Sequence, residues 1–270
     1  MSLTAAILLG AIQGLTEFLP VSSSAHLILA REFFGWELKP EFGLAFDVAL
    51  HIGTLAAIVT FFRLEIFGML RAMPRILSPQ PDPSALLARH IAIGTVPVVI
   101  VAVLFNDFIE QVLRHPAVAA GALAFGATLM IAAERLSPRT RTENSLGWGE
   151  AVLIGCAQAA ALIPGMSRSG STITMGMFLG MRRDAAARFT FLLAIPATLA
   201  AALKEMVALT EMTLPDGSIT LIVVGVVVSA LVGYVTIKYF LRFLAWNSLD
   251  VFAGYRLVLA TVTVFWLLRH

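Results

Sequence analysis

The sequence predicts an all-α polytopic membrane protein with six transmembrane helices and two re-entrant helical hairpins arranged as an inverted repeat. The first observation is composition: 59% of the 270 residues are hydrophobic and 13% are charged, whereas a soluble domain carries about 25% charged residues. The second is a series of apolar segments, several of them near the roughly 20 residues that a helix needs to cross the bilayer. The third is that two short segments each end in a Pro/Gly/Ser-rich break, which is typical of re-entrant hairpins.

The apolar segments follow one another along the chain, and none shows sustained strand alternation. One pair of short segments surrounds the break at Pro20, and a second pair surrounds the break at Pro164. Three longer segments follow each pair, which gives two hairpins and six spanning helices. The expected helices are 2–19, 22–34, 43–62, 86–106, 113–134, 149–163, 169–181, 187–205, 219–241 and 249–268.

Charged residues between the segments predict the orientation. Arginine gathers after the third, fifth and seventh segments, whereas the loops at about 31–41, 107–115 and 204–218 are rich in Asp and Glu. The positive-inside rule places the arginine-rich loops in the cytoplasm. That assignment is self-consistent only if residues 2–34 and 149–181 each leave the membrane on the side where they entered. The first hairpin then opens outward, the second opens inward, and both termini lie outside.

The two halves of the chain also resemble each other. The segment GAIQGLTEFLPVSSSAH parallels GCAQAAALIPGMSRSGS, with Pro20 opposite Pro164 after a one-residue slip. Because the halves begin on opposite sides, the repeat is inverted, and it should bring the two broken-helix tips together near the midplane. We expect one membrane domain, 1–270, made of inverted repeats at approximately 1–135 and 148–270.

The first tip gathers polar side chains that are costly in hydrocarbon. Gln13 and Glu17 are four residues apart and share one helix face. One serine after Pro20 would suffice to cap the next helix, yet three occur in a row, and His26 lies one turn beyond the first of them. Glu17 and His26 could form an acid–base or nucleophile–acid pair, while the surplus hydroxyls suit phosphate oxygens or a metal-bound water. The three serines are Ser22, Ser23 and Ser24.

The second tip, PGMSRSGST, has the composition of an anion site. A Gly/Ser-rich break before a helix exposes N–H groups at the positive end of the helix dipole, and Arg168 adds a guanidinium that matches phosphate oxygens bidentately. The alternative is a packing hinge with Arg168 at an interface, but an arginine near the midplane is costly without an anion. No Gly-x4-Gly-Lys-Ser/Thr pattern supports a nucleotide-binding P-loop. The candidate phosphate ligands of this tip are Gly165, Ser167, Ser169, Gly170 and Thr172.

Two other groups of polar residues lie on later segments. Asp47, His51 and Thr54 recur at helical spacing, so they either support the site or form an outer-leaflet rim, and both interpretations stay open. Tyr255 and Arg256 on the last segment are interpreted as packing or snorkelling residues.

At the two tips the chain resembles the undecaprenyl-diphosphate phosphatase family, also called bacitracin-resistance protein BacA. One family signature is an E/Q-x-x-x-E helix leading into Pro-Val-Ser-Ser and a His, which here runs from Gln13 to His26. The other signature is PG-x-SRSG-x-T, which here runs from Pro164 to Thr172. The stretch FDVALHIGTLAA also looks like the family's third helix, and length and hydropathy match over essentially the whole chain.

The resemblance implies hydrolysis of undecaprenyl diphosphate to undecaprenyl phosphate and inorganic phosphate, which recycles the lipid carrier of cell-wall synthesis and confers bacitracin resistance. The family's divalent cation, Mg²⁺ or Ca²⁺, would bind Glu17 and Gln13, although many relatives carry Glu at the latter position. The nucleophile stays open among His26, Ser23 and water. Glu17, His26 and Arg168 match the family's catalytic positions, and Ser23, Ser167 and Thr172 match its phosphate site.

A second function class uses the same elements. Inverted repeats with broken helices at the midplane are typical of alternating-access carriers, so a lipid-phosphate or anion transporter is the alternative hypothesis. A transporter has less need for Glu17 beside His26, and a membrane scaffold would leave both residues unexplained. We expect the partners to be a polyprenyl diphosphate lipid and membrane lipids, without nucleic acid, and a homodimer is left open. The expected location is the bacterial cytoplasmic (inner) membrane, with the active site facing the extracytoplasmic side.

Overall fold

The computed structural model describes residues 1–36, 40–105, 108–113, 115–209 and 217–269, which form helices and connecting turns without a strand. This confirms the predicted all-α class. The predicted acidic loop residues Glu37, Asp107, Glu211 and Asp216 lie outside the described residues. In chain order the α-helices are α1 (Leu3–Thr16), α2 (Ser23–Phe34), α3 (Pro40–Phe61), α4 (Arg63–Ala72), α5 (Pro83–Leu104), α7 (Pro116–Leu136), α8 (Trp148–Ala160), α9 (Arg168–Phe178), α10 (Arg183–Leu209), α11 (Ser218–Leu244) and α12 (Asp250–Leu267).

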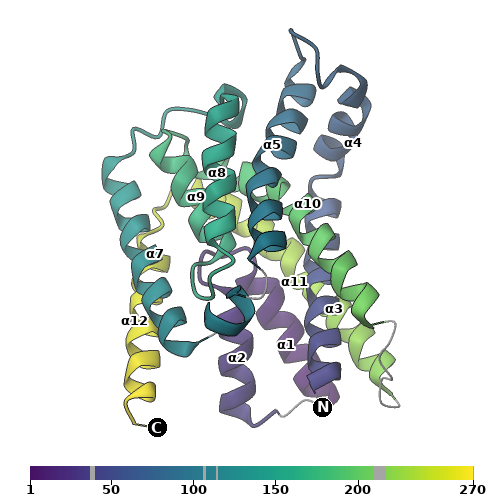
Figure 1. Cartoon of the computed structure of the whole chain (residues 1–270), viewed down its shortest axis with the longest axis vertical. Coiled ribbons are helices and arrows are strands. Elements are labelled where there is room, and N and C mark those ends of the chain that lie inside the picture. The colour runs from purple at the N-terminus through teal and green to yellow at the C-terminus, as the bar shows by residue number, and fades with distance from the viewer. Residues whose placement is uncertain (37–39, 106–107, 114, 210–216, 270) are drawn as a thin grey trace.

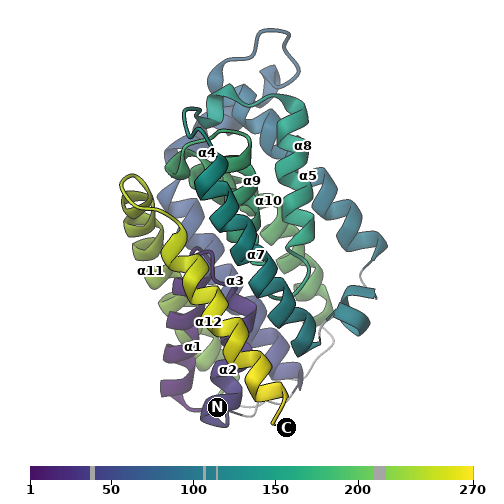
Figure 2. The same ribbon diagram turned by 90° about the vertical axis from the view of Figure 1, so that its left-hand side faces the viewer.

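Six of these helices match the predicted membrane spans. Among the described residues, α5, α7, α10, α11 and α12 are each long and apolar enough to cross a bilayer. A sixth span is formed by α3 if it is counted together with α4, from which it is separated by a 77° bend. Long neighbours pack side by side, as α7 and α12 do in Figure 2. The chain is therefore a multi-pass membrane protein.

Helix α4 was not predicted, because its residues were assigned to an arginine-rich loop. It carries an exposed apolar stripe of Leu64, Phe67 and Leu70, together with basic residues at both ends. A short helix of this kind is too polar to span the bilayer but suits its interface. It packs against α5 on the side of the molecule opposite both termini (Figure 1).

The two broken segments form hairpins that enter from opposite ends. Figure 1 shows α1 and α2 in the lower half, beside both termini, and α8 and α9 reaching from the top towards the centre. The chain reverses after α1 and after α8 near Pro20 and Pro164, where a proline cannot continue the helix. The tips meet inside the bundle, because Ser169 Oγ of the second hairpin donates to the carbonyl oxygen of Leu19 at 3.0 Å.

Each hairpin reverses through a serine with an unusual backbone. Ser22 precedes α2 with φ of 74°, and Ser167 precedes α9 with φ of 66°. A non-glycine residue in this left-handed region costs about 1–3 kcal/mol. Each hydroxyl lies 3.3 Å from the hydroxyl of the serine two positions later, Ser24 or Ser169. The two tips share this local geometry, while the repeat boundaries 1–135 and 148–270 stay a prediction.

Glycines let each hairpin pack closely on a spanning helix. A Cβ on Gly14 of α1 would lie 2.7 Å from the carbonyl oxygen of Ser229 in α11. A Cβ on Gly155 of α8 would lie 2.3 Å from the carbonyl oxygen of Gly94 in α5. Real Cβ atoms essentially never come this close, so the pairs α1–α11 and α8–α5 depend on these glycines.

Candidate active site

Glu17 lies directly after α1, where the first hairpin breaks, and is 9% exposed. The neighbouring Phe18 fixes its position, because that ring packs edge-to-face on Phe191 of α10 with 5.4 Å between ring centroids. Glu17 Oε2 accepts hydrogen bonds from Gln13 Nε2 at 3.0 Å and from Ser23 Oγ at 2.7 Å. Both helices of the first hairpin therefore hold the carboxylate in place.

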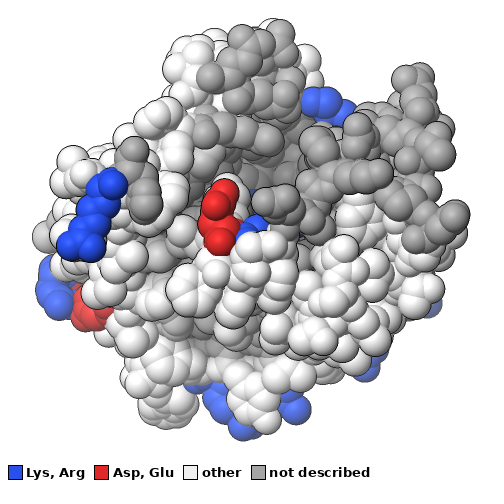
Figure 3. All heavy atoms as spheres, turned by 90° about the horizontal axis from the view of Figure 1, so that it is seen from below, with Lys and Arg blue, Asp and Glu red and all other residues white. Residues whose placement is uncertain are grey.

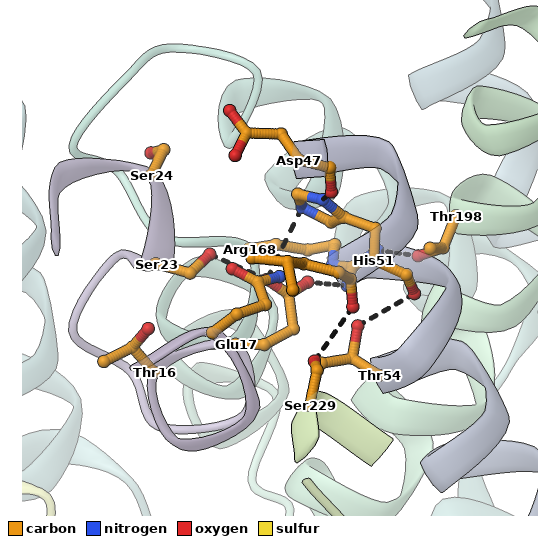
Figure 4. A network of polar contacts seen from close by, with 12 residues as sticks. Thr16, Glu17, Ser23, Ser24, Asp47, His51, Thr54, Arg168, Thr198 and Ser229 are labelled. Atoms are coloured by element: carbon orange, nitrogen blue, oxygen red, sulfur yellow. Dashed lines mark hydrogen bonds and ion pairs between the residues drawn. The ribbon is translucent and has the colours of Figure 1, made fainter. Parts of the chain in front are cut away.

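Arg168 is the first residue of α9 and reaches across to the first hairpin. Its Nη2 donates to Glu17 Oε1, and its Nη1 donates to Thr198 Oγ1 of α10. Figure 4 shows the two charged side chains meeting between α3, α9 and the first tip. The attraction between the buried carboxylate and the guanidinium offsets the cost of removing both charges from water. Removal of either partner would leave a buried charge without a counter-ion. The structure thus places the predicted acid and the predicted cation in direct contact.

The imidazole beside Glu17 belongs to His51 of α3. His51 Nε2 lies 3.8 Å from Glu17 Oε2, and His51 Nδ1 donates to the carbonyl oxygen of Asp47 at 2.8 Å. Thr54 Oγ1 in turn donates to the carbonyl oxygen of His51 at 2.9 Å. The sequence left open whether Asp47, His51 and Thr54 support the site or form a rim. The structure places His51 beside the site.

The predicted pair of Glu17 with His26 is not formed in the structure. Among the described residues, the contacts of His26 are with Ser22, whose carbonyl oxygen lies 2.8 Å from Nδ1, and with Tyr255, whose hydroxyl lies 2.6 Å from Nε2. The physical reason is local: bonding to the carbonyl one turn earlier directs the ring towards α12. Sequence spacing indicated that His26 was near the tip but could not specify this direction.

The predicted phosphate ligands of the second tip lie together, but several of their groups already have partners. Ser167 Oγ accepts from the N–H of Gly170 at 3.2 Å, which caps α9. Thr172 Oγ1 donates to the carbonyl oxygen of Arg168 at 2.7 Å. In the first tip, Ser23 contacts Glu17, while the hydroxyls of the other two serines contact each other. Their roles in binding phosphate stay predictions.

Arg256 of α12 is fully buried and holds the second tip in place. Its Nη2 donates to the carbonyl oxygens of Gly165 and Met166, both at 3.0 Å, and to that of Ala122 in α7 at 3.2 Å. A Cβ on Gly170 would lie 2.7 Å from its Nη1, so a side chain there would displace the guanidinium. This agrees with the interpretation of Arg256 as a packing residue.

The site lies towards the face that carries both termini. Figure 3 looks onto that face, where the described residues around the central hollow are mostly uncharged and an acidic and a basic group are visible near the centre. Asp47 is bound by Arg31 of α2, an ion pair whose side chains are 33% and 21% exposed, so Asp47 belongs to the rim. Sequence reasoning missed Arg31 and Thr198: the charge of Arg31 in the segment 22–34 was a signal that was not used, whereas Thr198 is an ordinary residue of a spanning helix.

The first tip offers oxygen donors for a cation. Gln13 Oε1 is buried without a hydrogen-bond partner, and the same side chain contacts Glu17. Amide and carboxylate oxygens are ligands that Mg²⁺ and Ca²⁺ accept, and Mg²⁺ typically uses one or two carboxylates together with substrate phosphates. In the described part of the chain no group of three or more His, Cys, Asp or Glu could hold a metal ion. Gln13 and Glu17 are thus the residues of this tip whose oxygens could help to hold a cation.

Known proteins match the chain over nearly its whole length. Residues 6–262 match the family described as bacitracin resistance protein BacA. An undecaprenyl-diphosphatase of Rubrobacter xylanophilus is 44% identical over 265 residues, covering 97% of each chain. Undecaprenyl-diphosphatase 2 of Stutzerimonas stutzeri is 46% identical over 270 residues, again covering 97% of each chain. An undecaprenyl-diphosphatase of Thioalkalivibrio sulfidiphilus is 42% identical and covers 98% of this chain and 99% of the relative.

Proposed function

The chain belongs to the bacitracin resistance protein BacA family, and from this premise we propose that it is an undecaprenyl-diphosphatase. Full-length relatives at 42–46% identity carry that name. The enzyme hydrolyses undecaprenyl diphosphate to undecaprenyl phosphate and inorganic phosphate, which returns the lipid carrier to cell-wall synthesis and lowers sensitivity to bacitracin. Nothing in the relatives' names favours the transporter hypothesis.

The contact between Glu17 and Arg168 is the observation that supports the proposed mechanism. A guanidinium binds carboxylates and phosphates through the same fork of donors, so Glu17 occupies the position that suits a phosphate group. The substrate's diphosphate replaces the carboxylate on Arg168. Glu17 stays beside the bound phosphate, because Gln13 and Ser23 still hold it. Substrate binding therefore frees the carboxylate to act as a base.

The reaction needs one nucleophile and one proton acceptor, and the geometry favours an oxygen nucleophile. The attacking oxygen forms a bond to the terminal phosphorus, the bond from that phosphorus to the bridging oxygen breaks, and its electron pair leaves with undecaprenyl phosphate. Glu17 accepts the proton of Ser23, which donates to it at 2.7 Å, or of a water in the same place. A phosphoserine formed by Ser23 would then be hydrolysed by water. His26 is the less direct nucleophile, because its Nε2 contacts Tyr255.

Positive charge around the phosphate stabilises the transition state. Arg168 and the amides at the N-terminus of α9 supply fixed donors where negative charge develops. His51, 3.8 Å from Glu17, can take up the proton that the carboxylate collects. A divalent cation, Mg²⁺ or Ca²⁺, held by Glu17 and Gln13 would neutralise phosphate charge when bound.

The isoprenoid tail of the substrate needs an apolar path away from the tips. A cavity of about 770 Å³ lies between α5 and α8, and its lining is apolar throughout. It reaches Leu162 and Ile163 in the turn after α8, and this turn leads directly to Arg168. When the diphosphate of the lipid binds Arg168, its isoprenoid tail would lie along this cavity.

The proposed membrane orientation is supported by the basic residues of α4 and by the end of the bundle at which the first hairpin opens. The predicted cytoplasmic arginines of α4 lie at the end of the bundle opposite both termini (Figure 1). The first hairpin opens at the other end, beside the termini. We place the enzyme in the bacterial cytoplasmic membrane with its active site facing the extracytoplasmic side.

Turnover by detergent-purified protein tests the function. Wild-type protein should release inorganic phosphate from undecaprenyl diphosphate, and Arg168→Ala should lower kcat/KM by roughly 10²-fold or more, equivalent to about 2.7 kcal/mol of barrier. Arg135→Ala is the matched control, because Arg135 pairs with Asp250 and is 63% exposed. Retained substrate binding without turnover in the wild type would favour the carrier, and near-wild-type turnover of Arg168→Ala would contradict the role of the guanidinium.

A further inference from the structure

Two consecutive residues of α12 contact the two hairpins. Arg256 binds the carbonyl oxygens of Gly165 and Met166 in the second tip. Tyr255 contacts His26 in the first hairpin, across 229 residues of sequence. Because Arg256 is fully buried and has several carbonyl partners, the position of α12 along its axis is fixed. The hydroxyl of Tyr255 is therefore held at a defined position relative to both tips.

The two contacts of His26 define its tautomer. The carbonyl oxygen of Ser22 can only accept a hydrogen bond, so Nδ1, 2.8 Å away, must carry the proton. In the neutral ring, Nε2 then has a lone pair and accepts from the Tyr255 hydroxyl at 2.6 Å. The two rings also stack, with 5.6 Å between centroids and 13° between planes. The Ser22 carbonyl thus sets the protonation pattern of the imidazole, and Tyr255 restrains its orientation.

We propose that Tyr255 is a positioning residue for His26: it holds the ring, whose Nδ1 is protonated by its contact with Ser22, so that Nε2 faces the Tyr255 hydroxyl. A histidine poised as a base or nucleophile depends on which nitrogen carries the proton, and a partner on the other nitrogen decides this. Here the backbone of Ser22 holds one side of the ring and Tyr255 the other. A proton taken by Nε2 can be shared with the Tyr255 oxygen. This inference rests on the proposed phosphatase function for its kinetic consequence.

Substitution of Tyr255 by Phe tests the role kinetically. Tyr255→Phe removes only the hydroxyl and keeps the stacked ring, so it should lower kcat about tenfold, equivalent to about 1.4 kcal/mol, and leave KM within about twofold. Tyr239→Phe is the matched control, because Tyr239 lies on α11 and is 58% exposed. In a His26→Ala background, Tyr255→Phe should have no further effect, because the hydroxyl acts through the imidazole. Multiplicative losses in the double variant, a change in KM alone or wild-type turnover of Tyr255→Phe would each overturn the proposal.

Nitrogen NMR of the histidine rings separates this inference from the phosphatase function. In ¹⁵N-histidine-labelled protein, the His26 resonances, identified by their loss in His26→Ala, should show a protonated Nδ1 and an unprotonated Nε2. Tyr255→Phe should shift the Nε2 resonance, and Tyr239→Phe should not. An Nε2-protonated ring in the wild type, or identical His26 resonances in Tyr255→Phe, would overturn the proposal even if turnover is normal. If the wild type showed no turnover, the phosphatase function would be contradicted. The NMR result would still show whether Tyr255 holds the ring of His26.

Discussion

Replacing Glu17 by Gln should have opposite effects on turnover and on ligand binding. In the resting structure Glu17 binds Arg168, so an incoming diphosphate must first displace this carboxylate. A neutral amide of the same shape can still accept from Gln13 and Ser23, but it competes far less well for the guanidinium. Glu17→Gln should therefore bind a diphosphate more tightly while it loses the base.

The sizes of the gain in binding and of the loss in turnover can be derived from typical interaction energies. A hydrogen bond to a charged group contributes about 1.5–3 kcal/mol, so removing the competition should tighten binding of a non-hydrolysable diphosphate about 10- to 100-fold. Loss of a general base typically lowers turnover about 10²- to 10⁴-fold. Because Glu17 is only 9% exposed, solvent can replace little of its contribution.

The assay combines calorimetry with phosphate release. Binding of a methylene-bridged farnesyl diphosphate analogue is measured by titration calorimetry in detergent with a chelator present, so that loss of a cation held by Glu17 does not contribute, and kcat is measured on undecaprenyl diphosphate. Glu65→Gln is the matched control, because Glu65 pairs with Arg188 at 2.7 Å on the other side of the bundle and is partly exposed. Weaker or unchanged analogue binding by Glu17→Gln would refute the idea that carboxylate and phosphate compete for Arg168.

Three further variants and treatments have expected outcomes. Glu134→Ala should lower the free energy of unfolding by about 3–5 kcal/mol, as measured by thermal denaturation. The reason is that Glu134 is buried and accepts from Arg183 at 2.5 Å and from the N–H of Leu249 at 2.7 Å. A loss below about 1 kcal/mol would contradict its place in this network. A chelator should abolish phosphate release, and added Mg²⁺ or Ca²⁺ should restore it. Gln13→Glu, which adds a second carboxylate to the site, should lower the Mg²⁺ concentration needed for half-maximal activity. Full activity in the chelator would rule out the cation. Ala160→Trp, which fills the cavity between α5 and α8, should raise KM for undecaprenyl diphosphate and not for farnesyl diphosphate, and equal changes for both substrates would place the tail elsewhere.

The hairpins were predictable because their signals are local. Pro20 and Pro164 interrupt apolar segments, and each interruption carries polar residues that hydrocarbon would not tolerate without a partner. The same reasoning singled out Glu17 and Arg168, which the structure brings into contact. Helix α4 was missed because its several charged residues resemble those of a loop, although the structure forms a helix there with an exposed apolar stripe.

The histidines show where local reasoning ended. His26 is close in sequence to Glu17 and was paired with it, yet His51 lies beside the carboxylate and His26 contacts Tyr255. Tyr255 had been interpreted as a packing residue, since nothing in the last segment indicates that its hydroxyl reaches the first hairpin. Thr198 likewise carried no signal, although it binds Arg168.

The sequence by itself determined the membrane-embedded helical class, the two breaks and the charged group at each tip. It could do so because a bilayer restricts the backbone to a few forms and makes every polar residue within an apolar segment conspicuous. Only the tertiary structure decided which imidazole faces Glu17 and which residues of α10 and α12 reach the tips. Those contacts depend on the rotation of each helix about its axis and on its shift along the neighbouring helices, which are set by close packing between segments far apart in the chain.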